Sequence, residues 1–165
     1  MDHTLEAERY LVRAAPVEFA DFYAAEWQGV FRPLAVILRD VDLAHEATDE
    51  AMTRAYQHWS RVRCMDNPSG WVYRVALNWS RTQLRRRAIA ARLLPHETLD
   101  PGEPVVEPGL VGAVAQLPMR QREVVVLRYV LDWSEVEIAA ALGIPRGTVK
   151  SRLHRALARL REEMS

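Results

Sequence analysis

The sequence has little cysteine and glycine and no long apolar run. Among its 165 residues there is one Cys, Cys64, and there are seven Gly. A single thiol cannot form a disulfide within the chain, and no Cys and His residues follow a metal-binding spacing. No apolar stretch approaches the roughly 20 residues of a membrane-spanning helix, and the N-terminus lacks the pattern of a signal peptide. We therefore expect a cytoplasmic protein without metal, cofactor or membrane insertion.

Sequence signatures of catalysis are missing as well. There is no Gly-rich phosphate loop and no local motif that brings Ser, His and Asp side chains together. The five His residues share no spacing. Alternating β-branched patterns are scarce, whereas Leu, Ala and Arg, which helices favour, are abundant. We predict an all-α protein that is not an enzyme and has no small-molecule substrate.

The charge is balanced overall but unevenly distributed. Formal net charge is zero, which by itself argues against a nucleic-acid partner. However, residues 81–92 hold five Arg and no acid, and residues 145–161 hold six Lys or Arg and no acid. Between them, residues 95–108 hold four acidic residues and no Lys or Arg. The zero total therefore conceals two basic patches and an acidic connector, although a single charge run is often only a solvated helix face.

Apolar periodicity predicts three helices in the first part of the chain. The first helix covers about 19–38, with a kink or break expected at Pro33. The second runs from about 43 to 59, with Asp42 as its N-cap and Tyr56 among its inward residues. A loop is predicted over 60–70, because Asn67-Pro68-Ser69-Gly70 is strong turn chemistry. The third helix is predicted from about 69 to 91.

A proline-rich, acidic stretch follows and predicts an extended linker. It divides the chain into an N-terminal extension (1–16), a first helical domain (17–92), the linker (93–109) and a second helical domain (110–165). In the second domain we expect helices near 110–116 and from Pro118 to about Val130. Ser134 and Glu137 fit a capping box at the start of a short helix that Gly143 ends. A last helix then continues to about Glu163.

This order of elements is that of a helix-turn-helix, in which the second helix enters the major groove of DNA. The last helix separates into two faces. Its apolar positions are Val149, Leu153, Ala156, Leu157 and Leu160. The opposite face carries Lys150, Ser151, His154 and Arg155, which are placed to reach base edges. Arg146, Arg152 and Arg159 flank them and suit phosphates, and Thr148 lies where the helix N-terminus can add backbone contacts.

Several segments closely resemble the extracytoplasmic-function (group 4) sigma factors. GTVKSRLHRA at 147–156 and LPMRQREV at 117–124 are similar to region 4 of that family. DEAMTRAY at 49–56, PSGWVYRVALN at 68–78 and LRR at 84–86 are similar to region 2. The resemblance covers about residues 17–162, and its strength lies in two domains that follow each other in the right order.

The resemblance implies a dissociable subunit that binds core RNA polymerase and promoter DNA. Region 4 of the family reads the −35 element, and region 2 reads and opens the −10 element. For the −10 element the implied residues are Arg61, Asn67, Trp71, Arg74, Asn78, Arg81, Arg85 and Arg86. For docking on the polymerase they are Glu46, Asp49, Glu50 and Arg54. An anti-sigma factor is a common partner in the family, although no residue here encodes one visibly.

The sequence departs from the family at three places. Asp49 stands where the family often has Gln, Thr82 where it often has Asp, and Arg39 where Gly commonly precedes the Asp that closes the first helix.

Independently of the resemblance, a pocket for an unstacked base needs aromatic surfaces and donors beside a basic groove. Trp71 and Trp79 are eight positions apart, which predicts a shared helix face and a common role, in base stacking or in the core.

Two other functions remain open at this point. A conventional helix-turn-helix regulator would bind duplex operators as a dimer without polymerase, but it leaves the Arg-rich stretch at 81–92 and Trp71 unexplained. Alternatively, the first domain could be a pure protein-interaction module that titrates polymerase. Promoter opening by variants at Asn78 and Trp71 distinguishes this alternative from the sigma factor.

Overall fold

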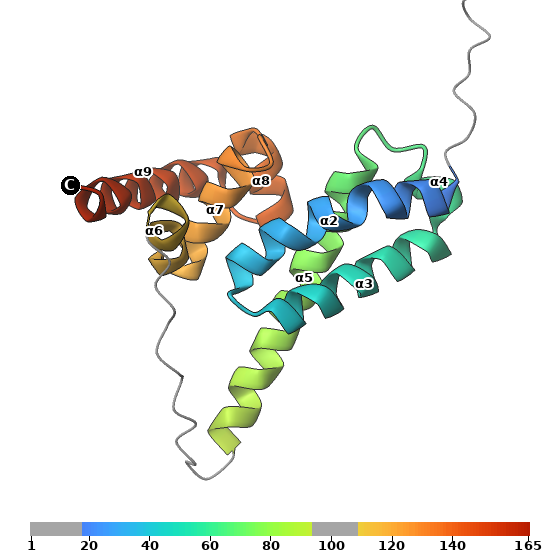
Figure 1. Cartoon of the computed structure of the whole chain (residues 1–165), viewed down its shortest axis with the longest axis horizontal. Coiled ribbons are helices and arrows are strands. Elements are labelled where there is room, and N and C mark those ends of the chain that lie inside the picture. Colours follow the sequence, from blue (N-terminus) through green and yellow to red (C-terminus); the bar gives the residue numbers. More distant parts are fainter. Residues whose placement is uncertain (1–17, 94–108) are drawn as a thin grey trace, which may run out of the picture.

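The structure is a computed structural model that describes residues 18–93 and 109–165, which are helical and contain no strand (Figure 1). The predicted all-α fold is therefore confirmed for these residues. The predicted N-terminal extension and nearly all of the acidic linker lie outside them. None of the described helices is long and apolar enough to cross a membrane. The helices are α2 (Phe19–Leu38), α3 (Val41–Gln57), α4 (Trp59–Val62), α5 (Pro68–Leu93), α6 (Leu110–Gln116), α7 (Met119–Tyr129), α8 (Glu135–Leu142) and α9 (Arg146–Glu163).

Helices α2 to α5 form the first group, in which α3 packs against both α2 and α5. The inward face of α3 is rich in alanine, and Ala44, Ala47, Ala51 and Ala55 are completely buried. Small side chains allow the neighbouring helices to approach closely, and larger residues on α2 and α5 fill the space between them. Those residues are Val30, Leu34, Ile37, Val72, Tyr73, Ala76 and Leu77.

The start of α3 differs from the prediction. The N-cap is Asp40 and not Asp42, because the Asp40 carboxylate accepts a hydrogen bond from the backbone N–H of Leu43 at 2.8 Å. Asp42 lies two residues further on, in the first turn of the helix. The Leu43 N–H, together with the Arg87 guanidinium 2.9 Å away, holds the pKa of Asp40 below its usual value. The cap thus also connects α3 to the distal part of α5.

Three further sequence predictions need correction. Of the kink or break predicted at Pro33, the break is absent, because Pro33 is buried inside a helix that continues to Leu38. Tyr56 does not point inward, because it is 65% exposed. The predicted loop at 60–70 is interrupted by the short helix α4 and gives way to α5 at Pro68. Pro68 fits the first turn of a helix, where no N–H partner is needed.

Helix α2 ends in an unfavourable backbone conformation. Arg39 has φ of 53°, in the left-handed region that glycine adopts freely and other residues adopt at a cost. In this position its N–H donates to the Ala35 carbonyl oxygen and terminates the helix. Arg39, which stands where the resembled family commonly has Gly, therefore strains the backbone.

We expect Arg39→Gly to raise the free energy of unfolding by about 1 kcal/mol, because glycine removes the left-handed strain. The measurement is chemical denaturation followed by circular dichroism. Arg39→Ala is the matched control, since it removes the same charge but keeps a Cβ in the left-handed region. Equal stabilities of the Gly and Ala variants would show that the backbone conformation is not the cause.

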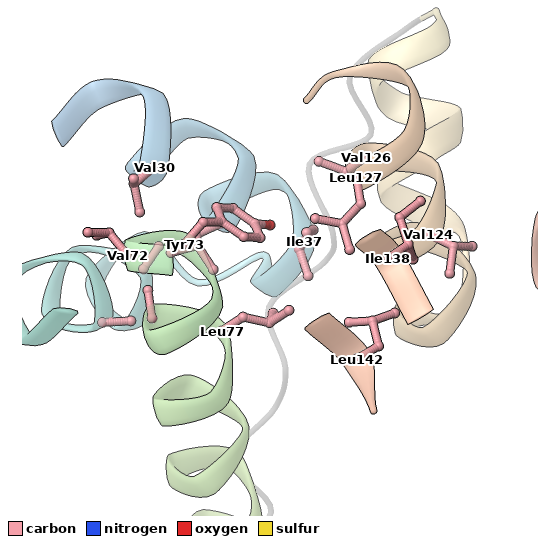
Figure 2. Close-up of a cluster of buried hydrophobic side chains, with 14 of the residues drawn as sticks. Val30, Ile37, Val72, Tyr73, Leu77, Val124, Val126, Leu127, Ile138 and Leu142 are labelled. Carbon is pink, nitrogen blue, oxygen red and sulfur yellow. The ribbon is translucent and has the colours of Figure 1, made fainter. Parts of the chain in front are cut away.

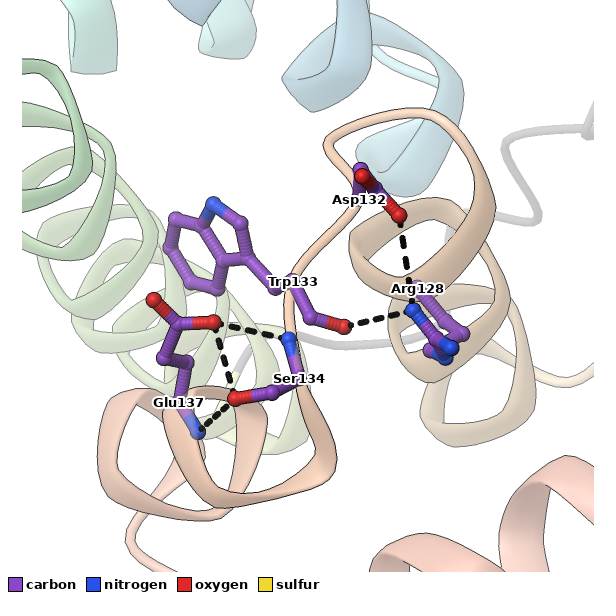
Figure 3. A network of polar contacts seen from close by, with 5 residues as sticks. All are labelled: Arg128, Asp132, Trp133, Ser134 and Glu137. Carbon is purple, nitrogen blue, oxygen red and sulfur yellow. Dashed lines mark hydrogen bonds and ion pairs between the residues drawn. The ribbon is translucent and has the colours of Figure 1, made fainter.

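Helices α6 to α9 form the second group, in which α7 and α8 both pack on α9. The predicted capping box is present: the Ser134 hydroxyl accepts from the Glu137 N–H, and the Glu137 carboxylate accepts from the Ser134 N–H (Figure 3). The Ser134 N–H and the Ser134 hydroxyl, which also donates to this carboxylate at 2.8 Å, hold the pKa of Glu137 below its usual value. Gly143, with φ of 64°, ends α8 as predicted. The sequence thus encodes the helix-turn-helix locally.

The two groups are packed against each other. Helix α7 lies against α2, and one cluster of buried apolar residues runs through both groups. Ile37 and Leu77 of the first group point toward Leu127, Ile138 and Leu142 of the second (Figure 2). The order of elements predicted two groups, but nothing in it predicted this contact.

Candidate nucleic-acid interface

The basic face of α9 is open to solvent. Lys150, His154, Arg155 and Arg159 are exposed, whereas Ser151, Arg152 and Thr148 are half-buried. On the opposite face Val149, Leu153, Ala156 and Leu160 are buried, as predicted, while Leu157 is only half-buried. The hydrophobic face is fixed by α7 and α8, so the charged face is held outward on a rigid element.

An acidic residue on α8, which the sequence analysis did not single out, orders the start of this face. The Glu135 carboxylate accepts from Arg146 Nε at 2.9 Å and lies 4.0 Å from Lys150 Nζ. The Arg146 and Lys150 side chains are each 60% exposed, so solvent screens the two pairs and they contribute little to stability. Their effect is to orient the side chains of Arg146 and Lys150 on α9 before any nucleic acid is present. The turn between α8 and α9 brings these residues together, although eleven positions separate Glu135 from Arg146.

Part of α5 and the turn before it form a hollow beside the second group. Asn67, Gly70, Trp71 and Arg74 line it on one side, and the cavity measures about 170 Å³. The Asn67 side chain accepts from the Gly70 N–H at 2.8 Å. A Cβ on residue 70 would lie 2.6 Å from Asn67 Nδ2, so the Asn67 side chain would have to move and would lose this bond. The opposite side is lined by Trp133, Glu137, Ala140 and Ala141, none of which the sequence analysis connected with this surface.

A second hollow, of about 370 Å³, lies between α3 and α5. It contains Asn78, Trp79 and Arg86 from α5 together with Arg54 from α3. Trp71 and Trp79 therefore line different hollows, although both indoles pack against the hydrophobic core, which is one of the two predicted common roles. Eight positions on a helix leave an angular offset of about 80°, which is enough here to direct the two rings toward different neighbours.

The predicted arginines of the first group differ in their surroundings. Arg61, Arg85 and Arg86 are exposed. Arg81 instead forms two hydrogen bonds with the Glu123 carboxylate, at 2.8 and 3.1 Å. Thr82, one of the family departures, donates its hydroxyl to the Asn78 carbonyl oxygen at 3.1 Å within α5. Arg74, the fifth predicted arginine, is exposed as well, so the structure leaves four of the five open to a ligand.

The acidic face of α3 contains the residues predicted to bind polymerase. Glu46 is exposed, and Glu50 pairs with Arg54 one turn later at 2.8 Å. Asp49 accepts a hydrogen bond from Trp27 Nε1 at 2.8 Å and lies 3.2 Å from His45 Nδ1. An Asp in place of the family's frequent Gln therefore has a structural partner on α2. Within the described residues, no three His, Cys, Asp or Glu side chains gather as a metal site would require.

Comparison with known proteins connects both groups of helices to transcription. The profile of the family described as Sigma-70, region 4 matches residues 110–160. The RNA polymerase sigma-E factor of Streptomyces coelicolor is 33% identical over 154 residues, which cover 90% of this chain and 86% of that protein. The ECF RNA polymerase sigma factor SigL of Mycobacterium tuberculosis is 32% identical, covering 94% of this chain and 89% of that one.

Solved structures share the fold at lower sequence identity. The sigma factor RpoE from Bartonella quintana, in complex with the anti-sigma factor NepR, is 20% identical with a TM-score of 0.70. This match covers 87% of the present chain and 94% of that one. CnrH, in complex with the cytosolic domain of CnrY, has a TM-score of 0.57 over 88% and 86% of the two chains, again at 20% identity. These two likenesses support the helical architecture.

Proposed function

Because this chain belongs to the extracytoplasmic-function sigma factors of RNA polymerase, we propose that its α9 reads the −35 element and its α5 the −10 element of a promoter. The protein binds core RNA polymerase and directs transcription initiation. The observation that carries the assignment of α9 is its face of exposed cations, to which the helix itself adds no acidic residue before Glu162, held outward by a packed helix-turn-helix. We assign base reading to Lys150, Ser151, His154 and Arg155, and phosphate contacts to Arg146, Thr148, Arg152 and Arg159.

The assignment of the −10 contacts rests on chemistry beside α5. Asn67, Trp71 and Arg74 combine an amide, an aromatic face and a cation at one hollow, and Asn78 and Arg86 lie at the other. Unstacked bases bind to aromatic faces, and the backbone of a single strand follows a line of cations. We therefore place the opened strand along α5, with Arg61, Arg81 and Arg85 on its phosphates.

For the contact with polymerase we propose the exposed side of α3. Glu46, Glu50 and Arg54 are accessible there, and Asp49 is half-buried against Trp27. We further propose that 17–92 and 110–165 act as separate domains, which 93–109 connects while both are held on the polymerase. The protein contributes no chemistry of its own in this proposal, and it acts in the cytoplasm, where the polymerase is.

The decisive experiment is in vitro transcription with core RNA polymerase on a pool of random promoters. A sigma factor should enrich templates that share two elements at a fixed separation, one upstream and one at the melted region. A conventional regulator would enrich palindromic duplex sites and would bind them as a dimer without polymerase. Failure to enrich any template with core polymerase would contradict the assignment.

We expect the free protein to bind promoter duplexes weakly, with a Kd in the non-specific range of about 10⁻⁴–10⁻⁶ M at physiological salt. Its formal net charge is zero, so few counter-ions are released by each small basic patch. Holoenzyme should bind much more tightly, because polymerase holds both groups over their elements and raises their effective concentration. Gel-shift titrations of the same promoter with and without core polymerase measure the difference. Specific nanomolar binding by the free protein would contradict it.

A further inference from the structure

One acidic side chain lies within the basic surface that we assign to the −35 element. Glu135 is the first residue of α8, and its carboxylate accepts from Arg146 Nε at 2.9 Å. The same carboxylate oxygen lies 4.0 Å from Lys150 Nζ. Arg146 and Lys150 are four positions apart, so they share a face at the N-terminal end of α9, which a helix-turn-helix protein directs at base edges. In the proposed complex Glu135 is therefore next to the DNA.

The Glu135 carboxylate is held in this place from two sides. Its side chain is 27% exposed, whereas the side chains of Arg146 and Lys150 are each 60% exposed. On the other side, the N-terminus of α8 carries a partial positive charge, which favours an acid in the first turn. The carboxylate is thus the less accessible partner in the cluster, and it restrains two mobile cations more than they restrain it.

The pairing leaves donors of both cations free for DNA. Glu135 occupies the Nε donor of Arg146, and among the described residues neither Nη group has an acceptor. Lys150 is at ion-pair distance and keeps its ammonium donors. The carboxylate nevertheless repels phosphates. Two cations and one acid give the cluster one net positive charge in place of two, so it neutralises one phosphate and not two.

This repulsion acts unequally on preferred and other sequences. Binding to duplexes of any sequence depends almost entirely on phosphates that Lys and Arg neutralise. At a preferred −35 element Lys150 instead binds a base edge, so it has no second phosphate to lose. A repulsive group that acts mainly on the wrong partner increases specificity. Glu135 has the position and the charge of such a group.

We propose that Glu135 is a specificity-determining residue, which keeps a second phosphate away from Arg146 and Lys150 and directs Lys150 at the −35 bases. The inference rests on the proposed function, because it assumes that α9 lies in the major groove of the −35 element. Lysine carries its charge on a flexible stem, so without a restraint it follows the nearest phosphate. The carboxylate lowers the total affinity of α9 for DNA and increases its discrimination between sequences.

Glu135→Gln tests the proposal, because it removes the charge and keeps the size of the side chain. Holoenzyme is titrated with two fluorescent promoter duplexes, one with the −35 element of the most enriched template and one with that element scrambled. Each phosphate neutralised on B-DNA adds about 0.9 to the slope of log K against log salt, so one more contact is about fivefold in affinity at about 0.15 M salt. We expect about fivefold tighter binding of the scrambled duplex and little change for the preferred one.

The salt dependence of binding provides a second readout, which loss of structure alone would not produce. On the scrambled duplex the salt slope of Glu135→Gln should steepen by about 0.9, whereas Glu135→Asp, which keeps the charge, should stay close to wild type. The matched control is Glu163→Gln, since it removes the same charge from an exposed side chain at the far end of α9. It should change neither the slope nor the discrimination. Circular dichroism confirms that each variant retains its helices.

Three results would overturn the proposal. One is an unchanged affinity ratio between the two duplexes in Glu135→Gln, and another is an equal change of that ratio in Glu163→Gln. The third is an equal loss of affinity for both duplexes, because Glu135 would then only support the fold of α8 and α9. If wild-type holoenzyme itself failed to distinguish the two duplexes, the assignment of α9 to the −35 element would be contradicted instead, so failure of the proposed function is recognised separately.

Discussion

Replacing Arg155 with Ala should reduce promoter binding by the holoenzyme roughly 5- to 150-fold at promoters with the preferred −35 base. The loss corresponds to about 1–3 kcal/mol, the discrimination that a bidentate contact between a side chain and a base edge provides. The Arg155 side chain is exposed on the face of α9 that points away from α7 and α8. Its removal should therefore cost binding without loss of stability.

The measurement is transcription by the variant holoenzyme from a library in which each −35 position is varied. Arg155→Ala should relax the preference at one position. Arg159→Ala is the matched control on the same helix, and it should weaken all sequences about equally because we assign Arg159 to a phosphate. If the two variants had the same profile across the library, the division of α9 into base-reading and phosphate-binding residues would be wrong.

Replacing both Trp71 and Asn78 with Ala should abolish most promoter opening while leaving assembly with core polymerase intact. Stacking of a base on an aromatic side chain contributes about 1–3 kcal/mol, and loss of the Asn78 amide removes hydrogen bonds as well. Together these losses predict a decrease of at least tenfold in open complexes. Permanganate reactivity of unpaired thymines measures opening, and fluorescence anisotropy measures binding to core polymerase.

The conservative Trp71→Phe serves as the control, since it keeps an aromatic face in the hollow beside Asn67. It should retain more opening than Trp71→Ala. Unchanged opening in the double variant would instead favour a first domain that only binds polymerase.

Where the determinants are local, the sequence predicted the structure closely. Leu110 and Gln116 bound α6 as expected, the Ser134 and Glu137 capping box formed, and Gly143 adopted the left-handed conformation that ends α8. Each of these features depends on residues within about four positions of one another, so a short stretch of sequence contains all the interacting groups. The two faces of α9 followed from helical periodicity for the same reason.

Predictions were wrong or incomplete where two nearby residues could play the same role, or where a contact with a residue distant in the sequence determined the structure. Asp40 and Asp42 are both good N-caps, and Arg87, 47 positions away, adds an ion pair to Asp40. Trp71 and Trp79 both pack against the core as one predicted role had it, but periodicity did not show that they line different hollows, one facing α8 and the other α3. No window of sequence contains α8 and α5 together, so their contact had no local signature.

The sequence by itself determined the helices, the helix-turn-helix and the basic, acid-free face of α9, because backbone hydrogen bonds, caps and side-chain periodicity act over one or two turns. Only the tertiary structure decided which of the predicted DNA contacts are free. It paired Glu123 with Arg81, and it placed Trp133 and α8 across a hollow from Trp71. These choices depend on burial and charge between residues 42 or more positions apart, and such residues meet only when the two helix groups pack together.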